Sequence, residues 1–163
     1  MLFCKRITND YKDIDCVYSV IDFIYRNNGN NNTYVGGINI TNPLNAADEF
    51  MFVKRFYRKT EGTQLRHYVI SPDPEDLFIP YMATELGYQI CAYYADKFQS
   101  VFSVHTNTSH LHIHVVINTV SYVNGKKLHE GIGDLITFEN YCRACYEIIK
   151  NKYRYIDKNL KAF

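Results

Sequence analysis

The chain has 163 residues, which is the size of one domain with a buried core. Its 47% hydrophobic and 21% charged residues are typical of an ordinary globular protein, and its net charge of +1 does not indicate a polyanionic partner. No apolar run is long enough to span a membrane. The five cysteines are scattered and no signal peptide is recognisable, so we expect a cytoplasmic protein with reduced thiols and no membrane insertion.

The first predicted element is a helix over residues 12–27. Apolar residues recur at helical spacing from Val17 to Ile24, and Asp13 and Asp15 suit the positive end of the first turn. An asparagine-rich run with one glycine then ends the helix as a polar loop.

The later predicted elements alternate between strands and helices. In chain order they are a short strand near 33–40, a helix over 44–59, a strand over 64–71, a helix over 80–98, a strand over 100–105, a strand over 111–122 and a helix over 134–152. Asn124-Gly125 predicts a type I′ turn that returns the chain through residues 126–128. Together they predict an α+β domain: a single antiparallel β-sheet with a central histidine-bearing strand and helices packed on the faces.

Ten residues contain four of the six histidines of the chain. They read His105-Thr-Asn-Thr-Ser-His110-Leu-His112-Ile-His114 and are followed by Val-Val-Ile-Asn118. Because successive residues of a strand point to opposite faces, His110, His112 and His114 share one face and the apolar residues between them share the other. Imidazole is the commonest metal ligand, so this row of histidines predicts a functional site.

The strand that ends at His105 can pair antiparallel with the histidine strand and set His105 opposite His112. Directly opposed residues share a face, so His105, His112 and His114 are predicted to converge on one point. Three neutral imidazoles leave coordination positions open, which is the arrangement of a catalytic metal site. His110 is the alternative third ligand, although three ligands on one strand reach a single ion less easily. The candidates for orienting the ligand rings are Asn107, Asn118 and His110.

The pattern His105-x6-His112-x-His114-x3-Asn118 resembles the third motif of conjugative relaxases, the MobA-like mobilization nucleases of the HUH endonuclease superfamily. The likeness continues in weaker motifs that come in the right order along most of the chain, in an early helix, a strand over 65–71 and a turn over 124–129. Such nucleases often continue past this domain. We therefore expect residues 1–163 to be a single relaxase domain in the N-terminal part of a longer protein.

The resemblance implies a metal-dependent, site- and strand-specific DNA nickase that starts conjugative transfer or mobilization. In this family a helix tyrosine attacks the scissile phosphate of single-stranded DNA, forms a 5′-phosphotyrosyl bond and leaves a free 3′-hydroxyl. Three histidines, here His105, His112 and His114, would hold a divalent metal ion, Mg²⁺ or Mn²⁺, with Zn²⁺ as an alternative occupant. The implied partners are single-stranded or hairpin origin-of-transfer DNA and relaxosome accessory proteins.

Two positions depart from the family pattern. Asn107 stands where the family has an aspartate, so a neutral amide replaces a carboxylate beside His105. The frame around the family's tyrosine reads Asp22-Phe23-Ile24-Tyr25-Arg26, which places Phe23 in the nucleophile position. Phenylalanine has no hydroxyl and cannot attack phosphorus.

Three interpretations of the nucleophile position remain open. Phe23 is a deliberate Tyr→Phe change that traps uncleaved DNA, or Tyr25 or Tyr18 is the nucleophile, or the chain is a natural homologue that binds DNA without cleaving it. At about 100° per helical residue, Phe23 and Tyr25 lie roughly 200° apart, so only one of them can face the histidines.

The segment His110-Leu-His112-Ile-His114-Val-Val also resembles the histidine-triad pattern of nucleotide hydrolases and transferases. In that class the middle histidine attacks a phosphate and no metal is needed. This alternative leaves His105, Asn118 and the early helix unexplained.

A groove for single-stranded DNA needs cations that follow the phosphates. The candidate DNA contacts in this chain are Arg26, Arg55, Arg58, Arg66, Ser71, Lys126 and Lys127.

Overall fold

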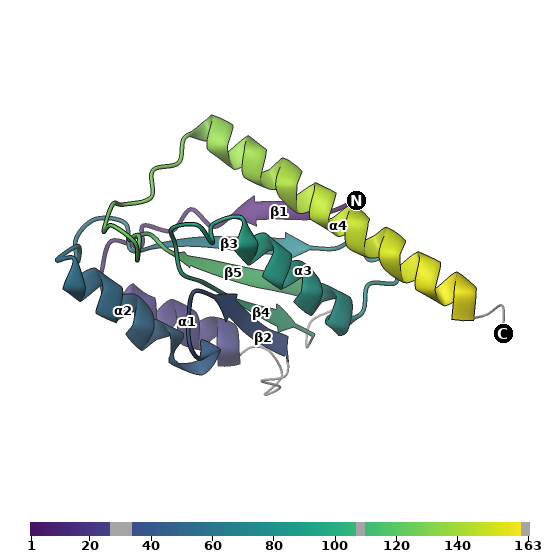
Figure 1. The fold of residues 1–163 in the computed structure, drawn as a ribbon, viewed down its shortest axis with the longest axis horizontal. Coiled ribbons are helices and arrows are strands. Elements are labelled where there is room, and N and C mark those ends of the chain that lie inside the picture. The colour runs from purple at the N-terminus through teal and green to yellow at the C-terminus, as the bar shows by residue number, and fades with distance from the viewer. Residues whose placement is uncertain (27–33, 107–109, 161–163) are drawn as a thin grey trace.

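The computed structural model describes residues 1–26, 34–106 and 110–160. Over these residues a single sheet carries helices on both faces, which confirms the predicted α+β class (Figure 1). The elements in chain order are β1 (Phe3–Arg6), α1 (Cys16–Arg26), β2 (Val35–Ile38), the 3₁₀ helix η2 (Pro43–Asn45), α2 (Ala46–Phe56), β3 (Leu65–Ser71), α3 (Pro80–Ala92), β4 (Ser100–His105), β5 (His112–Asn118) and α4 (Ile132–Leu160).

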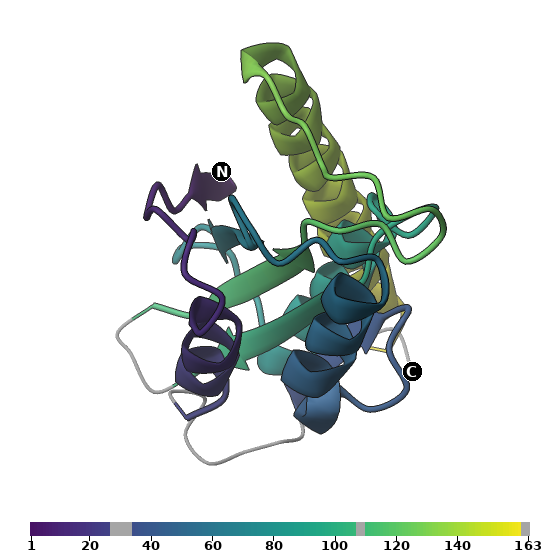
Figure 2. The same ribbon diagram turned by 90° about the vertical axis from the view of Figure 1, so that its left-hand side faces the viewer.

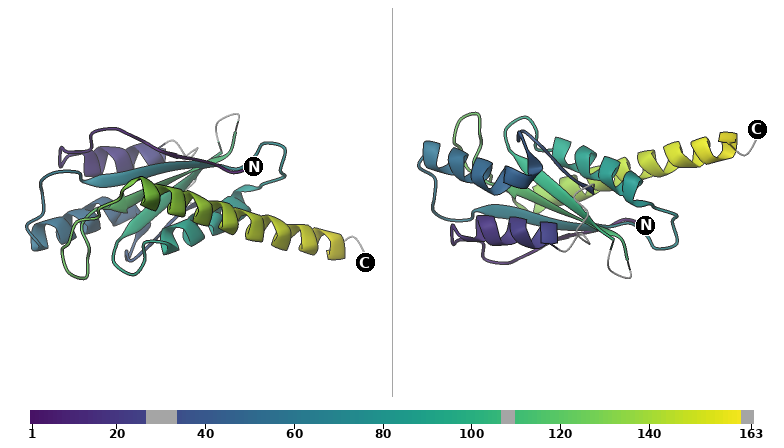
Figure 3. Two further views of the ribbon diagram at one scale, coloured as in Figure 1. Left: turned by 90° about the horizontal axis from the view of Figure 1, so that it is seen from above. Right: turned by 90° about the horizontal axis from the view of Figure 1, so that it is seen from below.

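The five strands lie in the order β1-β3-β5-β4-β2, and every neighbouring pair is antiparallel. The histidine strand β5 is therefore central, as predicted. Its residues Ile113, Val115 and Ile117 belong to a core beneath α3 and α4. The opposite face packs under α1 and α2 through residues such as Val116, which is in phase with His114. Helices α1 and α2 lie side by side (Figure 2), while α4 extends beyond the sheet (Figure 3).

Strand β1 was not predicted, because four residues at the edge of a sheet carry too short a pattern to stand out. It pairs with β3, from Phe3 opposite Ser71 to Arg6 opposite Tyr68. Helix α1 begins at Cys16, four residues later than predicted. The reason is local: a side-chain oxygen of Asp13 accepts the backbone N–H of Asp15 at 2.9 Å and builds a turn before the helix. The predicted loop after α1 lies outside the described residues.

Several further elements are shorter than predicted, among them α3 and β5. Helix α3 ends at Ala92, because the next residues switch to tighter bonds such as Tyr93 N–H to the carbonyl of Ile90. Strand β5 ends at Asn118, where the N–H of Thr119 turns to the carbonyl of Gln64.

The predicted type I′ turn at 124–125 is wrong. Gly125 has a positive φ of 69°, but Asn124 has not, and a type I′ turn needs both. The chain instead makes a wider loop in which the N–H of Gly125 reaches the carbonyl of Ser121, closed by one isolated pair between Val120 and Lys127. A side chain on Gly125 would also lie 2.4 Å from the ring of Tyr57.

Candidate metal centre

Three histidines from the two central strands meet at one end of the sheet. His105, the last residue of β4, pairs directly with His112, the first residue of β5, as the sequence predicts. His114 follows on the same face, and one ring nitrogen from each of the three residues lies within 4.8 Å of the others. Imidazole nitrogens that share one cation at about 2 Å lie roughly 3–4 Å apart, so the three rings need to move little to hold an ion. His110 is exposed and does not belong to the cluster.

Hydrogen bonds to the backbone orient two of the three rings. Nε2 of His105 donates to the carbonyl of Ile24 in α1 at 2.7 Å, and Nδ1 of His112 donates to the carbonyl of His110 at 3.0 Å. A ligand histidine usually donates its other N–H in this way, which fixes the tautomer. His105 therefore directs Nδ1 at the shared point and His112 directs Nε2. His110 therefore helps to orient His112 through its backbone carbonyl.

The environment keeps the buried histidines neutral. Burial lowers the pKa of His114 to about 2, with further contributions from His105, His67 and His112. Burial also lowers the pKa of His105. Only the neutral ring has a lone pair for a cation, so desolvation prepares these groups to act as metal ligands.

Behind His114 lies a fourth histidine that sequence reasoning missed. Nε2 of His67 is 2.7 Å from Nδ1 of His114, and Nδ1 of His67 is 3.0 Å from the hydroxyl of Tyr11. Burial lowers the pKa of His67 to about 4. The alternation of β3 puts His67 on one face with Leu65 and Val69. This face is the one that carries the histidines of β5, because β3 pairs with β5 in this register. No local sequence pattern specifies that pairing.

The side chain of Phe23 in α1 lies against His114. Its ring meets the ring of His114 edge to face, with centroids 5.7 Å apart. Both line a cavity of about 360 Å³, together with Tyr11 and His67. The residue that the resemblance assigns to the nucleophile position, Phe23, therefore lies beside the candidate ligands.

Neither alternative tyrosine shares that cavity. Tyr25 donates its hydroxyl to the carbonyl of Pro43, and burial raises its pKa. Tyr18 donates to a carboxylate oxygen of Asp48 at 2.9 Å. Both line a separate cavity between α1 and α2. The roughly 200° rotation expected between positions 23 and 25 explains why Tyr25 is turned away when Phe23 faces the histidines.

The asparagines expected to orient the ligand rings have different positions. Asn118 is on the histidine face, but its amide donates to the carbonyl of Phe50 and to Oε1 of Gln99 and accepts the N–H of Val120. These bonds tie the end of β5 to α2, so the expected role of Asn118 at a ligand ring is corrected. Asn107 lies outside the described residues.

The candidate DNA contacts are divided between two ends and two faces of the sheet. Ser71 follows Ile70, which pairs with Ile113, so it lies at the level of His112 on the histidine face. Arg66 points to the opposite face and bonds Glu130 at 3.0 Å, so this candidate DNA contact does not lie on the histidine face.

The remaining basic candidates are exposed except Lys127, which is half-buried and donates from Nζ to the carbonyls of Glu61 and Thr63. Arg26 at the end of α1 pairs with Asp22 at 2.7 Å, and both side chains are exposed. Arg55 and Arg58 are exposed near the end of α2. The other two, Lys126 and Lys127, line a cavity with Lys59 and His129 beyond the opposite end of β5 from the histidines.

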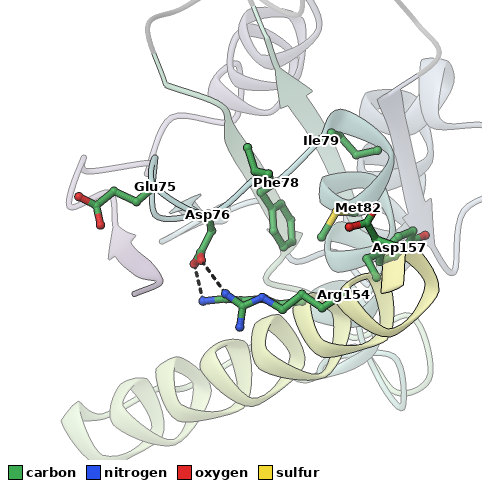
Figure 4. A pocket seen from close by; sticks show the side chains of 10 residues that line it. Glu75, Asp76, Phe78, Ile79, Met82, Arg154 and Asp157 are labelled. Carbon is green, nitrogen blue, oxygen red and sulfur yellow. Dashed lines mark hydrogen bonds and ion pairs between the residues drawn. The ribbon is translucent and has the colours of Figure 1, made fainter. Parts of the chain in front are cut away.

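A further cavity of about 470 Å³ lies between residues 75–79, α3 and the end of α4 (Figure 4). Asp76 links two sides of this cavity, because it pairs with Lys150 at 2.6 Å and with Arg154 at 3.5 Å, both in α4. No histidine lines it. Across the described residues, no helix has the length and apolarity that a membrane crossing requires.

The fold and site define a class of protein: a single-sheet α+β domain in which three histidines from two central strands are close enough together to be candidate ligands of one cation, beside an aromatic residue of a covering helix. A family model described as "Relaxase: MobA/VirD2-like, nuclease domain" matches residues 18–148, and the chain belongs to this relaxase family. The match includes the early helix and the histidine strand, which decides against the histidine-triad hydrolase alternative.

Two curated relatives support the family. The chain is 30% identical over 84 residues to protein rlx of Staphylococcus aureus, covering 52% of this chain and 25% of that protein. It is 25% identical over an alignment of 118 residues to the group II intron-interrupted relaxase LtrB of Lactococcus lactis, covering 57% of this chain and 21% of that protein. The aligned part thus spans about a quarter of each relative. No solved structure matches the chain significantly.

Proposed function

We propose that this chain has the fold and site of a metal-dependent, site- and strand-specific DNA-nicking domain, which binds single-stranded or hairpin origin-of-transfer DNA at the start of conjugative transfer or mobilization, and that Phe23 leaves it without the nucleophile. The observation that carries the proposal is the convergence of His105, His112 and His114 with Phe23 of α1 beside them. Membership of the relaxase family supports the reaction class.

The cation would be held by Nδ1 of His105 and by Nε2 of His112 and His114. When bound, it supplies Lewis-acid polarisation of a phosphoryl oxygen. The donor set consists of imidazole nitrogens, whereas Mg²⁺ prefers oxygen ligands. We therefore propose a first-row transition dication, with Zn²⁺ bound more tightly than Mn²⁺ and Mn²⁺ more tightly than Mg²⁺.

Phe23 determines what the chain can do as it stands. A tyrosine there would lose its phenolic proton and bond to phosphorus, while the bond to the 3′ oxygen breaks and that oxygen takes up a proton. The 5′ phosphate would remain as a tyrosyl ester. Phe23 lacks the oxygen for this step but fills the same space, so we propose that the chain binds and orients DNA without cleaving it.

The test is restoration of the hydroxyl by Phe23→Tyr. The protein is incubated with Mn²⁺ and a randomised single-stranded DNA library, and covalent adducts that survive denaturing electrophoresis are recovered and sequenced. Phe23→Tyr is expected to give adducts enriched in one sequence, and the parent chain none. Adding His112→Ala to Phe23→Tyr is the matched control and should abolish them.

Two outcomes would overturn parts of this proposal. Adducts formed by the parent chain and lost with Tyr25→Phe would make Tyr25 the nucleophile. DNA binding by Phe23→Tyr without any adduct would identify a binding-only homologue, which is the second candidate function.

The basic residues suggest how far the DNA extends. Ser71 lies near the histidines, whereas Lys126 and Lys127 lie beyond the far end of β5, a strand that spans on the order of 20 Å. We propose that bound DNA runs along this distance, with Arg55 and Arg58 of the α2 end as further phosphate contacts. Arg26 would contact it near the histidines.

The setting is also part of the proposal. We propose a bacterial cytoplasmic protein that works with relaxosome accessory proteins, and the bacterial origin of both curated relatives supports this.

A further inference from the structure

A buried chain of hydrogen bonds leads from the candidate metal centre to a tyrosine in the wall of the neighbouring cavity. It runs from Nδ1 of His114 to Nε2 of His67 at 2.7 Å and from Nδ1 of His67 to the hydroxyl of Tyr11 at 3.0 Å. The exposed fractions are 7% for His114, 4% for His67 and 9% for Tyr11. Tyr11 precedes the residues that the family model matches.

Such a chain can be polarised in two directions. In one, Tyr11 donates to Nδ1 of His67, and Nε2 of His67 donates to Nδ1 of His114. A neutral His114 then carries its proton on Nε2, which removes the lone pair that faces the other two ligands. In the other direction His114 donates from Nδ1 to His67, and His67 donates from Nδ1 to the oxygen of Tyr11.

Only the second direction is compatible with a cation at Nε2 of His114. Cation binding must therefore select the Nδ1–H tautomer of both His114 and His67, with no change in the charge of either ring. The hydroxyl of Tyr11 then accepts a bond from His67, and its own proton must turn away from His67. Phe23 and Asn9 line the cavity in which Tyr11 lies.

We propose that Tyr11 and His67 are positioning residues that couple cation binding at His114 to hydrogen-bond donation by Tyr11 into the cavity beside Phe23. The acceptor there would be an oxygen of the DNA backbone, and this second half of the inference rests on the proposed function. The first half, the linked tautomers, concerns the protein and the cation alone. The coupling is strong because these hydrogen bonds are buried: a buried polar group that loses its partner cannot bond to water instead.

The test of the first half needs no DNA. Zn²⁺ affinity is measured by titration calorimetry for the parent, Tyr11→Phe and His67→Phe, with Tyr57→Phe as the matched control because its hydroxyl bonds the carbonyl of Tyr122. His67→Phe should weaken binding by roughly 10- to 100-fold and Tyr11→Phe by less, as partners of metal ligands do. Tyr57→Phe should leave Zn²⁺ affinity unchanged.

Nitrogen NMR of the imidazoles reports the tautomers directly. Zn²⁺ should place the protons of both His67 and His114 on Nδ1 in the parent chain. Unchanged affinity in Tyr11→Phe, or a His67 that carries its proton on Nε2 with Zn²⁺ bound, would overturn the inference. Tyr11→Phe removes one oxygen atom, so the affinity test stands even if His67→Phe does not fold.

The second half is tested by the affinity for a single-stranded oligonucleotide library with and without Zn²⁺. Zn²⁺ should strengthen binding to the parent and to Tyr57→Phe more than to Tyr11→Phe. An equal gain in all three would overturn the donation by Tyr11 while leaving the tautomer coupling intact. Absence of any DNA binding by the parent would refute the proposed function instead.

Discussion

The buried lysine of α2 makes the stability of this domain depend on pH in a way that one substitution should remove. The side chain of Lys54 is fully buried, and its Nζ donates to the carbonyl of Gln64 at 2.8 Å. Burial lowers its pKa from 10.5 to about 7; the charge of Lys127 lowers it further and Cys16 opposes the shift. The folded state therefore disfavours the protonated amine.

The direction of the pH effect follows from proton binding in the two states. In the unfolded chain the amine keeps its proton up to about pH 10.4, whereas the folded chain releases it above about pH 7. Between these values the unfolded state binds more protons, so the free energy of unfolding rises with pH by at most about 1.4 kcal/mol per unit. From pH 7 to pH 9 this amounts to roughly 2–3 kcal/mol.

Lys54→Met removes the charge and keeps an unbranched side chain of similar length. The carbonyl of Gln64 stays satisfied, because the N–H and Oγ1 of Thr119 also donate to it. Urea unfolding should show Lys54→Met to be more stable than the parent at pH 6.5. This advantage should shrink by roughly 2–3 kcal/mol at pH 9.

Lys59→Met, at an exposed lysine just past the same helix, is the matched control and should show no such pH dependence. The reasoning is refuted if Lys54→Met and the parent differ by the same free energy of unfolding at both pH values. It is equally refuted if Lys54→Met is the less stable protein at pH 6.5.

Two further substitutions separate stability from binding. Asn118→Ala removes the bonds to Phe50, Gln99 and Val120, so urea unfolding should show a loss of about 1–3 kcal/mol, with Zn²⁺ affinity unchanged; a weakened Zn²⁺ site in a folded variant would contradict the assignment. Lys126→Ala should lower affinity for single-stranded oligonucleotides and reduce the slope of log affinity against log salt by about 0.7. An unchanged slope would mean that no phosphate contacts Lys126.

Local pattern predicted those parts of the site that lie close together in sequence. The period of two puts His112 and His114 on one face, and the short connection from β4 makes pairing with His105 the natural register. Helical spacing likewise fixes that positions 23 and 25 face different ways. The pairing of β3 beside β5 has no such local cause, so the place of His67 could not be predicted.

The errors have the same physical origin. Asn118 was expected near the ligand rings from its phase alone, but phase gives a face and not a partner, and α2 supplies the carbonyl it bonds. Arg66 was a candidate DNA contact because of its charge, and only the structure shows that its side chain bonds Glu130 on the face away from the histidines. Tyr11 lies in a turn before α1, and a turn has no hydrophobic periodicity from which its position could be predicted.

The sequence by itself predicted the kind of chemistry: three imidazoles converging from one hairpin, and a phenylalanine in the position that the resemblance assigns to the nucleophile. The tertiary structure decided which side chains surround them. It set Phe23 against His114, turned Tyr25 away and brought Tyr11 and His67 behind the ligand. The division is physical, because strand and helix periods act over a few residues, whereas strand order and helix packing depend on burial between segments far apart in the chain.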